Sequence, residues 1–162
     1  RMFKGRGVFG GLGAQFMKQS SQAHKDAIEA EEWIAELKRF DFDRIHSTTN
    51  LPAGGTIISA NKNYLATLRD DGNFVIYVSS HFVPSNIIWQ TNTGGKGHAP
   101  YRFTAQEDGN IVLYDSKNTP LWSSNTHGKG NAPYTLLLSE EGNLEWYGAK
   151  GKLQWESGST RK

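Results

Sequence analysis

The sequence predicts an all-β domain made of three equivalent antiparallel sheets, preceded by a helical extension. Three observations lead to this prediction. A unit of about 33 residues recurs three times, each unit holds a Gly-Asn turn among alternating apolar residues, and a tryptophan stands at the same place in each. Alternation with a period of two is typical of strands, whereas ankyrin and tetratricopeptide repeats of similar length are helical.

The chain is predicted to divide near residue 46, because residues 1–46 differ in composition from residues 47–162. Residues 25–40 are good helix formers. Their apolar side chains form a stripe at three-four spacing: Ala27, Ala30, Ile34 and Leu37, widened by Trp33 and Phe40. A helix of this length is marginal alone, so the stripe needs a partner. Packing against its own β domain and assembly between chains are both open interpretations.

The segment before this helix is rich in glycine and basic residues, with no acidic residue before Asp26. Residues 1–18 mix apolar side chains with lysine and arginine, so they could contact an anionic membrane. A flexible tail and a docking arm are the alternatives. The string GRGVFG at residues 5–10 matches a dinucleotide-binding pattern by its letters, but only four residues precede it, so it follows no strand and is interpreted as accidental.

The repeat is clearest after each tryptophan and before it. Residues 89–101 read WQTNTGGKGHAPY, and residues 122–134 read WSSNTHGKGNAPY. Upstream stand LRDDGNFVIY (68–77), AQEDGNIVLY (105–114) and LSEEGNLEWY (138–147). The first copy has about four additional residues around Pro84, between its tyrosine and its tryptophan. Trp89, Trp122 and Trp155 are therefore predicted to be equivalent core residues.

The second copy is predicted to form a hairpin with a three-residue loop and Gly109 in the left-handed conformation. Gln106 would end one strand and Asn110 would begin the next. Ile111 and Leu113 would then face the core, while the polar set gathers on the other face near the hairpin tip. One such hairpin cannot bury its apolar face alone, but three can bury theirs against one another.

The pattern Gln-x-Asp-x-Asn-x-Val-x-Tyr, followed by Trp-x-x-Asn-Thr, resembles the bulb-type mannose-binding lectin family over about residues 50–160. The resemblance implies a β-prism II fold of three antiparallel sheets about a pseudo-threefold axis. It also implies that Asp and Asn bind O2 of mannose, Gln binds O3, Tyr binds O4, and Val packs on the ring carbons. Such side chains suit a ligand made of hydroxyls.

The three copies match this pattern to different degrees, and we expect binding to rank second, first, third. The second copy is intact: Gln106, Asp108, Asn110, Val112 and Tyr114. The first copy has arginine in place of glutamine, which donates but cannot accept and could pair with the neighbouring aspartate: Arg69, Asp71, Asn73, Val75 and Tyr77. The third copy places a charge at the apolar contact and is expected to be inactive: Ser139, Glu141, Asn143, Glu145 and Tyr147.

No catalytic, metal or cofactor site is predicted. The sequence shows no pattern of a nucleophile paired with a general base, and its five histidines do not have the spacing of metal ligands. The absence of cysteine excludes disulfides and thiolate chemistry, and the Gly-Lys-Gly loops lack the Ser/Thr of a phosphate loop. A formal charge of +2 gives no global basic field for nucleic acid, and no nucleic-acid partner is expected.

Two functional hypotheses follow. The first is a non-catalytic lectin for mannose-type glycans, made multivalent as a homo-oligomer. The second is a structural or membrane-active assembly protein that uses the β domain as a scaffold, with sugar binding secondary. A secreted or extracellular location is expected, with a cytoplasmic one left open.

Overall fold

The computed structural model describes residues 42–78 and 81–161, and these form three four-stranded antiparallel sheets. The predicted helix at 25–40 and the proposed membrane contact at 1–18 lie outside the described residues. Sheet A has the order β1-β10-β11-β12, with strands Arg44–His46, Thr135–Leu138, Leu144–Tyr147 and Leu153–Glu156. Sheet B has the order β2-β7-β8-β9, with strands Asn50–Pro52, Arg102–Ala105, Ile111–Tyr114 and Pro120–Ser123. Sheet C has the order β3-β4-β5-β6, with strands Thr56–Ile58, Tyr64–Leu68, Phe74–Val78 and Ile87–Gln90.

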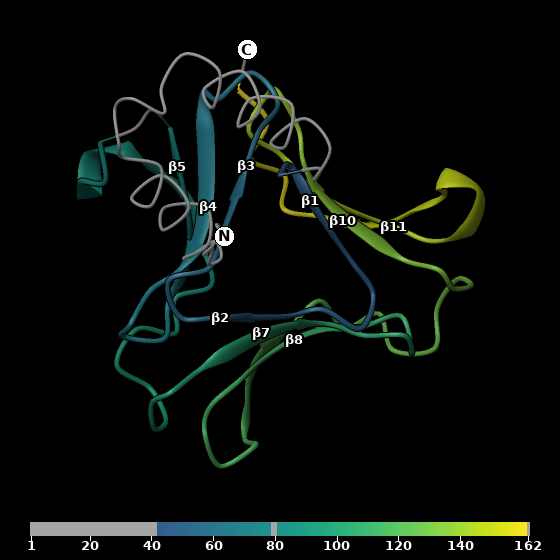
Figure 1. The fold of residues 1–162 in the computed structure, drawn as a ribbon, viewed down its shortest axis with the longest axis horizontal. Helices are drawn as coiled ribbons and strands as arrows, with labels where there is room; N and C mark the ends of the chain where they lie inside the picture. The colour runs from purple at the N-terminus through teal and green to yellow at the C-terminus, as the bar shows by residue number, and fades with distance from the viewer. Residues whose placement is uncertain (1–41, 79–80, 162) are drawn as a thin grey trace, which may run out of the picture.

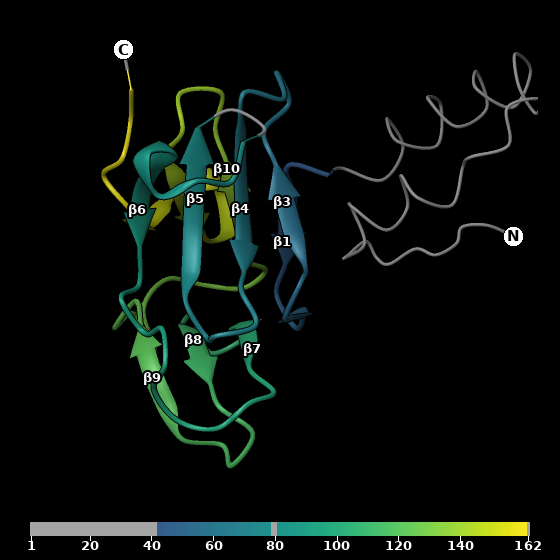
Figure 2. The same ribbon diagram turned by 90° about the vertical axis from the view of Figure 1, so that its left-hand side faces the viewer.

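Each sheet combines three consecutive strands of one repeat with one short strand from residues 44–58. Seen end-on, the sheets form the sides of a triangle (Figure 1), and in the side view the strands of sheet C run next to one another (Figure 2). β1 precedes residue 47 and pairs with β10, Ile45 opposite Leu136. The prism therefore begins by Arg44, slightly before the boundary that the sequence indicated. Short 3-10 turns at Pro84–Asn86 and Ala149–Gly151 precede β6 and β12.

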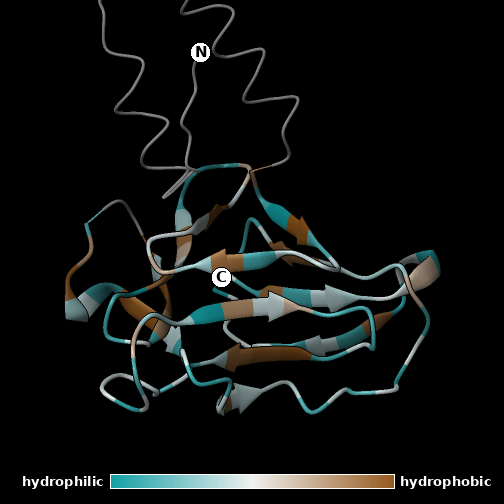
Figure 3. Cartoon of the chain, turned by 60° about the horizontal axis from the view of Figure 1, so that its bottom comes forward, coloured by the Kyte–Doolittle hydropathy of each residue, from teal (hydrophilic) through white to brown (hydrophobic). Residues whose placement is uncertain are grey.

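The core fills the interior of the triangle with the apolar residues that alternate along the strands. Ile111 and Leu113 of β8 are fully buried in it, as predicted. Phe74 of sheet C stacks on Phe103 of sheet B, with ring centroids 3.9 Å apart. In Figure 3, coloured by hydropathy, the hydrophobic residues lie mainly in the strands, and the connecting loops are mainly hydrophilic.

The three predicted central tryptophans meet one another. The ring centroids of Trp89 and Trp122 are 5.8 Å apart, those of Trp89 and Trp155 also 5.8 Å, and those of Trp122 and Trp155 5.5 Å. All three contacts are edge-on, an arrangement that aromatic rings favour. The three tryptophans thus occupy equivalent places in the three sheets, where they are partly buried and packed against the core.

The hairpin loops have the predicted geometry. Gly72, Gly109 and Gly142 take φ values of 91°, 95° and 86°, the left-handed region that favours glycine. In the second copy the loop is closed by Gln106 N–H donating to the carbonyl of Asn110 at 3.0 Å. A Cβ on Gly109 would also lie 2.7 Å from the carbonyl oxygen of Lys129. Both the backbone conformation and this close contact therefore require glycine here.

Candidate functional site

The predicted binding residues form one row on the outer face of each sheet, along the hairpin opposite the core. Row one is Arg69, Asp71, Asn73, Val75 and Tyr77 on the β4–β5 hairpin. Row two is Gln106, Asp108, Asn110, Val112 and Tyr114 on the β7–β8 hairpin. Row three is Ser139, Glu141, Asn143, Glu145 and Tyr147 on the β10–β11 hairpin. The register that buries Ile111 and Leu113 turns Val112 and Tyr114 outward, because strand neighbours point to opposite faces.

The asparagine of every row is held in the same way, through its side-chain oxygen. Asn110 Oδ1 accepts hydrogen bonds from Thr126 N–H at 3.1 Å and from Ser124 Oγ at 3.0 Å. Thr126 Oγ1 in turn donates to the carbonyl of Gly109 at 2.6 Å. The residues that follow each tryptophan thus lock the asparagine amide. The Asn-Thr signature after the tryptophan marks this lock, which the sequence analysis recognised only as part of the repeat.

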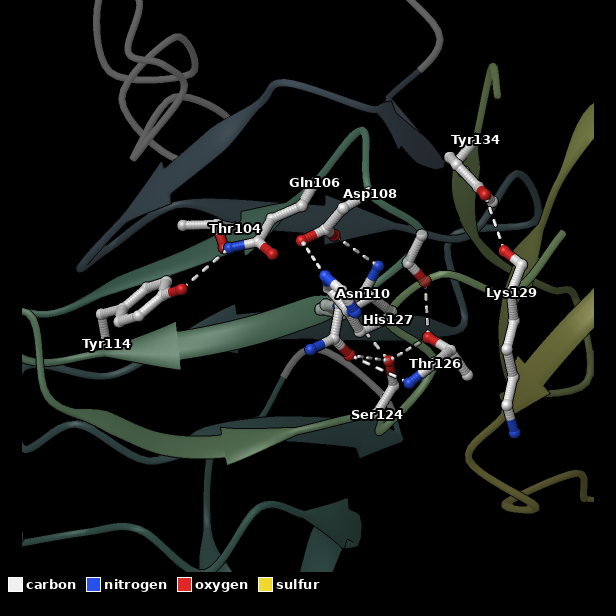
Figure 4. Close-up of polar contacts among 12 residues, drawn as sticks. Thr104, Gln106, Asp108, Asn110, Tyr114, Ser124, Thr126, His127, Lys129 and Tyr134 are labelled. Carbon is white, nitrogen blue, oxygen red and sulfur yellow. Dashed lines mark hydrogen bonds and ion pairs between the residues drawn. The ribbon is translucent and has the colours of Figure 1, made fainter. Parts of the chain in front are cut away.

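In row two, the side chain of Gln106 lies between Asp108 and Tyr114 (Figure 4). Only one orientation of its amide satisfies all neighbours. With Nε2 toward Asp108, both carboxylate oxygens lie 3.1 Å from it, and Oε1 accepts from the Tyr114 hydroxyl at 3.0 Å. The opposite orientation would place the amide oxygen against the carboxylate. Asp108 also accepts from Asn110 N–H at 2.9 Å, which fixes its position at the hairpin tip.

Row two keeps hydrogen-bonding capacity for a ligand. Asn110 Nδ2 has no hydrogen-bond partner within residues 42–78 and 81–161, while its oxygen is fully engaged. A carboxylate can accept about four hydrogen bonds, more than Asp108 receives here. Val112 supplies an apolar patch that is 4% exposed. The row therefore presents a fixed donor, an acceptor and an apolar floor side by side.

Row one is bonded to itself. Arg69 forms an ion pair with Asp71 at 2.8 Å, so the pairing expected from the sequence is confirmed. Asn73 Nδ2 donates to Gln90 Oε1 at 2.8 Å. The ring of Phe82 lies 5.2 Å from that of Tyr77, which is only 5% exposed. The asparagine nitrogen that has no partner in row two, among the described residues, therefore has a protein acceptor in row one.

Row three is closed by its two carboxylates. Glu145 accepts from the Tyr147 hydroxyl at 2.7 Å and from Asn143 Nδ2 at 2.9 Å, and Glu156 accepts from the same Nδ2 at 2.7 Å. The hydrogen bond to Glu145, together with burial and the charges of both glutamates, raises the pKa of Tyr147 to about 12. The apolar contact of row two is replaced here by a charge that engages both neighbouring polar groups.

Sequence reasoning missed several residues beside the rows. Gln90, Ser123 and Glu156 occupy the position after each central tryptophan, next to the row valine or its equivalent. Aligning the repeats and following the alternation from each tryptophan could have placed them on the outer face. Two further residues are peculiar to row two. Arg102 lies 4.5 Å over the Tyr114 ring, and His127 Nε2 lies 3.6 Å from Asp108.

Outside the rows, the described part of the chain contains one buried carboxylate, Asp115, and no metal-binding cluster. No group of three or more histidine, aspartate or glutamate side chains there is placed to hold a metal ion. No helix among the described residues is long and apolar enough to cross a membrane. Asp115, next to row two, is buried, and hydrogen bonds from the backbone N–H groups of Thr119, His98 and Lys117 lower its pKa despite that burial. Its carboxylate stabilises the loop after β8 by accepting from the N–H groups of Lys117 and Thr119 at 2.9 Å.

No protein-family profile matches the chain. It is 33% identical over 60 residues to a putative lectin of Acanthamoeba polyphaga mimivirus and 42% identical over 48 residues to a mannose-specific lectin of Aloe arborescens. These stretches cover 37% and 30% of this chain, and 29% and 40% of the two relatives. The matches thus span less than half the length of either curated relative.

Solved structures match nearly the whole prism. A monomeric monocot mannose-binding lectin from Gastrodia elata superimposes with a TM-score of 0.63 at 30% identity, over 73% of this chain and 98% of its own. The mannose-specific agglutinin of snowdrop bulbs, in complex with methyl-α-D-mannoside, gives 0.58 at 29% identity over 74% and 99%. A lectin of Marasmius oreades gives 0.62 at 26% identity over 72% and 91%. The three-sheet fold expected from the sequence is confirmed by this likeness.

Proposed function

The chain belongs to the family of bulb-type, monocot mannose-binding lectins, and from that membership we propose that it binds mannose or mannose-containing glycans through row two, without catalysis. One observation carries the choice of row. Within the described residues, the asparagine amide nitrogen is bonded to protein acceptors in rows one and three, whereas that of Asn110 in row two has none. Its donor is held in place and available to a hydroxyl.

The roles of the residues follow from their chemistry and from the family resemblance. Asp108 accepts and Asn110 donates at O2 of mannose, so a hydroxyl there meets both a fixed acceptor and a fixed donor. Gln106 meets O3, and the Tyr114 hydroxyl meets O4. Val112 packs under the ring carbons. These groups are already hydrogen-bonded to one another or to the loop, so little ordering is needed when sugar binds.

The test is a calorimetric titration of the wild-type protein and of Asn110→Ala with mannose. Loss of the Asn110 amide costs ~1–3 kcal/mol of binding free energy. A single small site of this kind binds at roughly millimolar strength, so that loss abolishes measurable binding. Galactose differs from mannose in the configuration at C2 and C4, and it should bind neither protein. Equal affinity of the two proteins for mannose would refute the assignment of row two.

Effective binding to a glycan-covered surface requires several sites on one particle. Linking weak sites gains ~10²–10⁴ in avidity, and this chain has one row with available groups. We therefore include homo-oligomerisation in the proposal. The sequence feature that supports it is the apolar stripe of residues 27–37, which needs a partner.

The assembly step is tested in the full-length chain by changing the stripe. Ile34→Ser combined with Leu37→Ser should lower the solution mass of the particle and its agglutination of mannose-bearing cells. Single-site affinity for mannose should not change, because row two is built from other residues. Agglutination that persists at unchanged mass would assign the stripe to packing within its own chain.

A further inference from the structure

The residue after each central tryptophan lies beside its row at the same place in all three sheets. Gln90 is opposite Val75, Ser123 is opposite Val112, and Glu156 is opposite Glu145 in the strand registers. Directly opposite residues on neighbouring strands have Cβ atoms about 4.5–5.5 Å apart and share a face. The three side chains therefore start from equivalent points on the outer face.

Where this residue has a long side chain, the side-chain oxygen accepts a hydrogen bond from the amide nitrogen of the row asparagine. Gln90 Oε1 accepts from Asn73 Nδ2 at 2.8 Å, and Glu156 Oε1 accepts from Asn143 Nδ2 at 2.7 Å. In row three Glu145 takes the same nitrogen as well. Gln90 thus engages one of the two N–H donors of Asn73, and the two glutamates engage both donors of Asn143.

Ser123 behaves differently because its side chain is short and turned to its own loop. Its Oγ donates to Asn125 Oδ1 at 2.9 Å and accepts from Asn125 N–H at 3.1 Å. The loop also locks Asn110 through its oxygen, so the amide cannot rotate to find another partner. Short length at position 123 and the locked amide together leave Asn110 Nδ2 without a partner among the described residues.

We infer that the residue after the central tryptophan is a positioning residue that selects which row can bind sugar, and that Ser123 keeps row two available. This inference rests on the proposed function of row two. It adds a rule that the five row residues alone do not contain: a row with the complete binding pattern loses a free asparagine N–H donor when glutamine or glutamate follows its tryptophan.

The first test is Ser123→Gln in the full-length protein. The strand register of row one shows that a glutamine at this position reaches the asparagine nitrogen. We expect mannose affinity to fall by about tenfold, the effect of one hydrogen bond that must be displaced. The control is Ser123→Thr, which keeps the hydroxyl bonded to Asn125 and is too short to reach Asn110, so it should bind mannose like the wild type.

The second test does not depend on sugar. Hydrogen exchange of the asparagine side-chain NH₂ groups, followed by NMR, should be slow for Asn73 and fast for Asn110. Ser123→Gln should slow exchange at Asn110, and Gln90→Ser should speed it at Asn73, with the other asparagines unchanged. A general loss of folding would instead alter all of them.

The two tests separate the failure of this inference from failure of the proposed function. If the wild type binds mannose and Ser123→Gln binds it equally well, the inference is wrong and the function stands. If the wild type does not bind mannose, the proposed function fails, and exchange rates still decide whether position 123 controls the amide. Unchanged exchange at Asn110 in Ser123→Gln would overturn the inference by itself.

Discussion

Rows one and two share aspartate, asparagine, valine and tyrosine at the same positions of equivalent hairpins, yet the asparagine nitrogen has a protein acceptor only in row one, within the described residues. The difference lies in the neighbours. In row one, Gln90 accepts from the Asn73 amide nitrogen and the ring of Phe82 lies against Tyr77. In row two, Ser123 bonds to Asn125 of its own loop, and the Asn110 nitrogen has no partner among the described residues. The donors that a row leaves unpaired thus depend on its neighbours as much as on its own residues.

Row three extends the comparison. Its asparagine is locked by the loop exactly where the others are locked, with Oδ1 accepting from Gly158 N–H at 2.9 Å. Glu145, in place of valine, then draws in both the amide and the tyrosine hydroxyl. One substitution at the apolar position therefore removes two polar groups from possible use by a ligand.

The largest expected effect comes from copying that substitution into row two. In Val112→Glu the new carboxylate should bond to Asn110 Nδ2 and to the Tyr114 hydroxyl, as Glu145 does in its own row. Losing two sugar contacts at ~1–1.5 kcal/mol each lowers mannose affinity by about a hundredfold. Titration calorimetry measures the loss. Val112→Ala, which removes only the apolar contact, should bind better than Val112→Glu; equal losses would show that the charge does not capture the neighbours.

A second variant tests the comparison in the opposite direction, by opening row one. Asn110→Ala first silences row two, and Arg69→Gln, Phe82→Ala and Gln90→Ser then remove the three protein partners of row one. We expect mannose binding to return at roughly millimolar strength. Arg69→Gln alone in the same background should not restore it, because Gln90 still holds Asn73. Restoration by Arg69→Gln alone would mean that only the missing amide limits row one.

Most of the fold could be predicted from the sequence because the same pattern of strands and turns occurs in all three copies of the repeat. The strand alternation, the left-handed Gly109 and the tryptophan cluster each follow from patterns that recur at a fixed offset. β1 was not placed in the prism, because three residues are too few to show an alternation, and its role depends on pairing with β10, far along the chain.

The placement of the row residues on the hairpins could be predicted from the sequence, but most of their hydrogen bonds could not. The ion pair of Arg69 with Asp71 could be foreseen because the two lie two positions apart on one hairpin. The contact of Asn73 with Gln90 joins residues 17 apart and requires the register between β5 and β6, which includes an irregularity. Phe82 reaches Tyr77 from a connection whose path no local pattern indicates. Local chemistry can be inferred from sequence, whereas cross-strand contacts require the structure.

The smallest expected effect concerns the tyrosine at the end of row three. The Tyr147 hydroxyl donates to Glu145 Oε1 at 2.7 Å, and this bond, burial and the nearby negative charges raise its pKa from an ordinary value of 10.0 to about 12. Because the folded pKa lies above the ordinary one, the contribution to stability is complete below pH 10 and is lost as pH rises through 12.

Glu145→Val, which restores the residue of rows one and two, removes the hydrogen bond and one of the two charges. The pKa of Tyr147 should then fall from about 12 toward 10, with Glu156 keeping it from returning completely. Ultraviolet absorbance of tyrosinate against pH measures the change, and Tyr147→Phe identifies the transition among the six tyrosines. An unchanged transition near pH 12 would mean that Glu145 does not hold the hydroxyl. In that case the closure of row three would have to come from Glu156 alone, through its bond to Asn143.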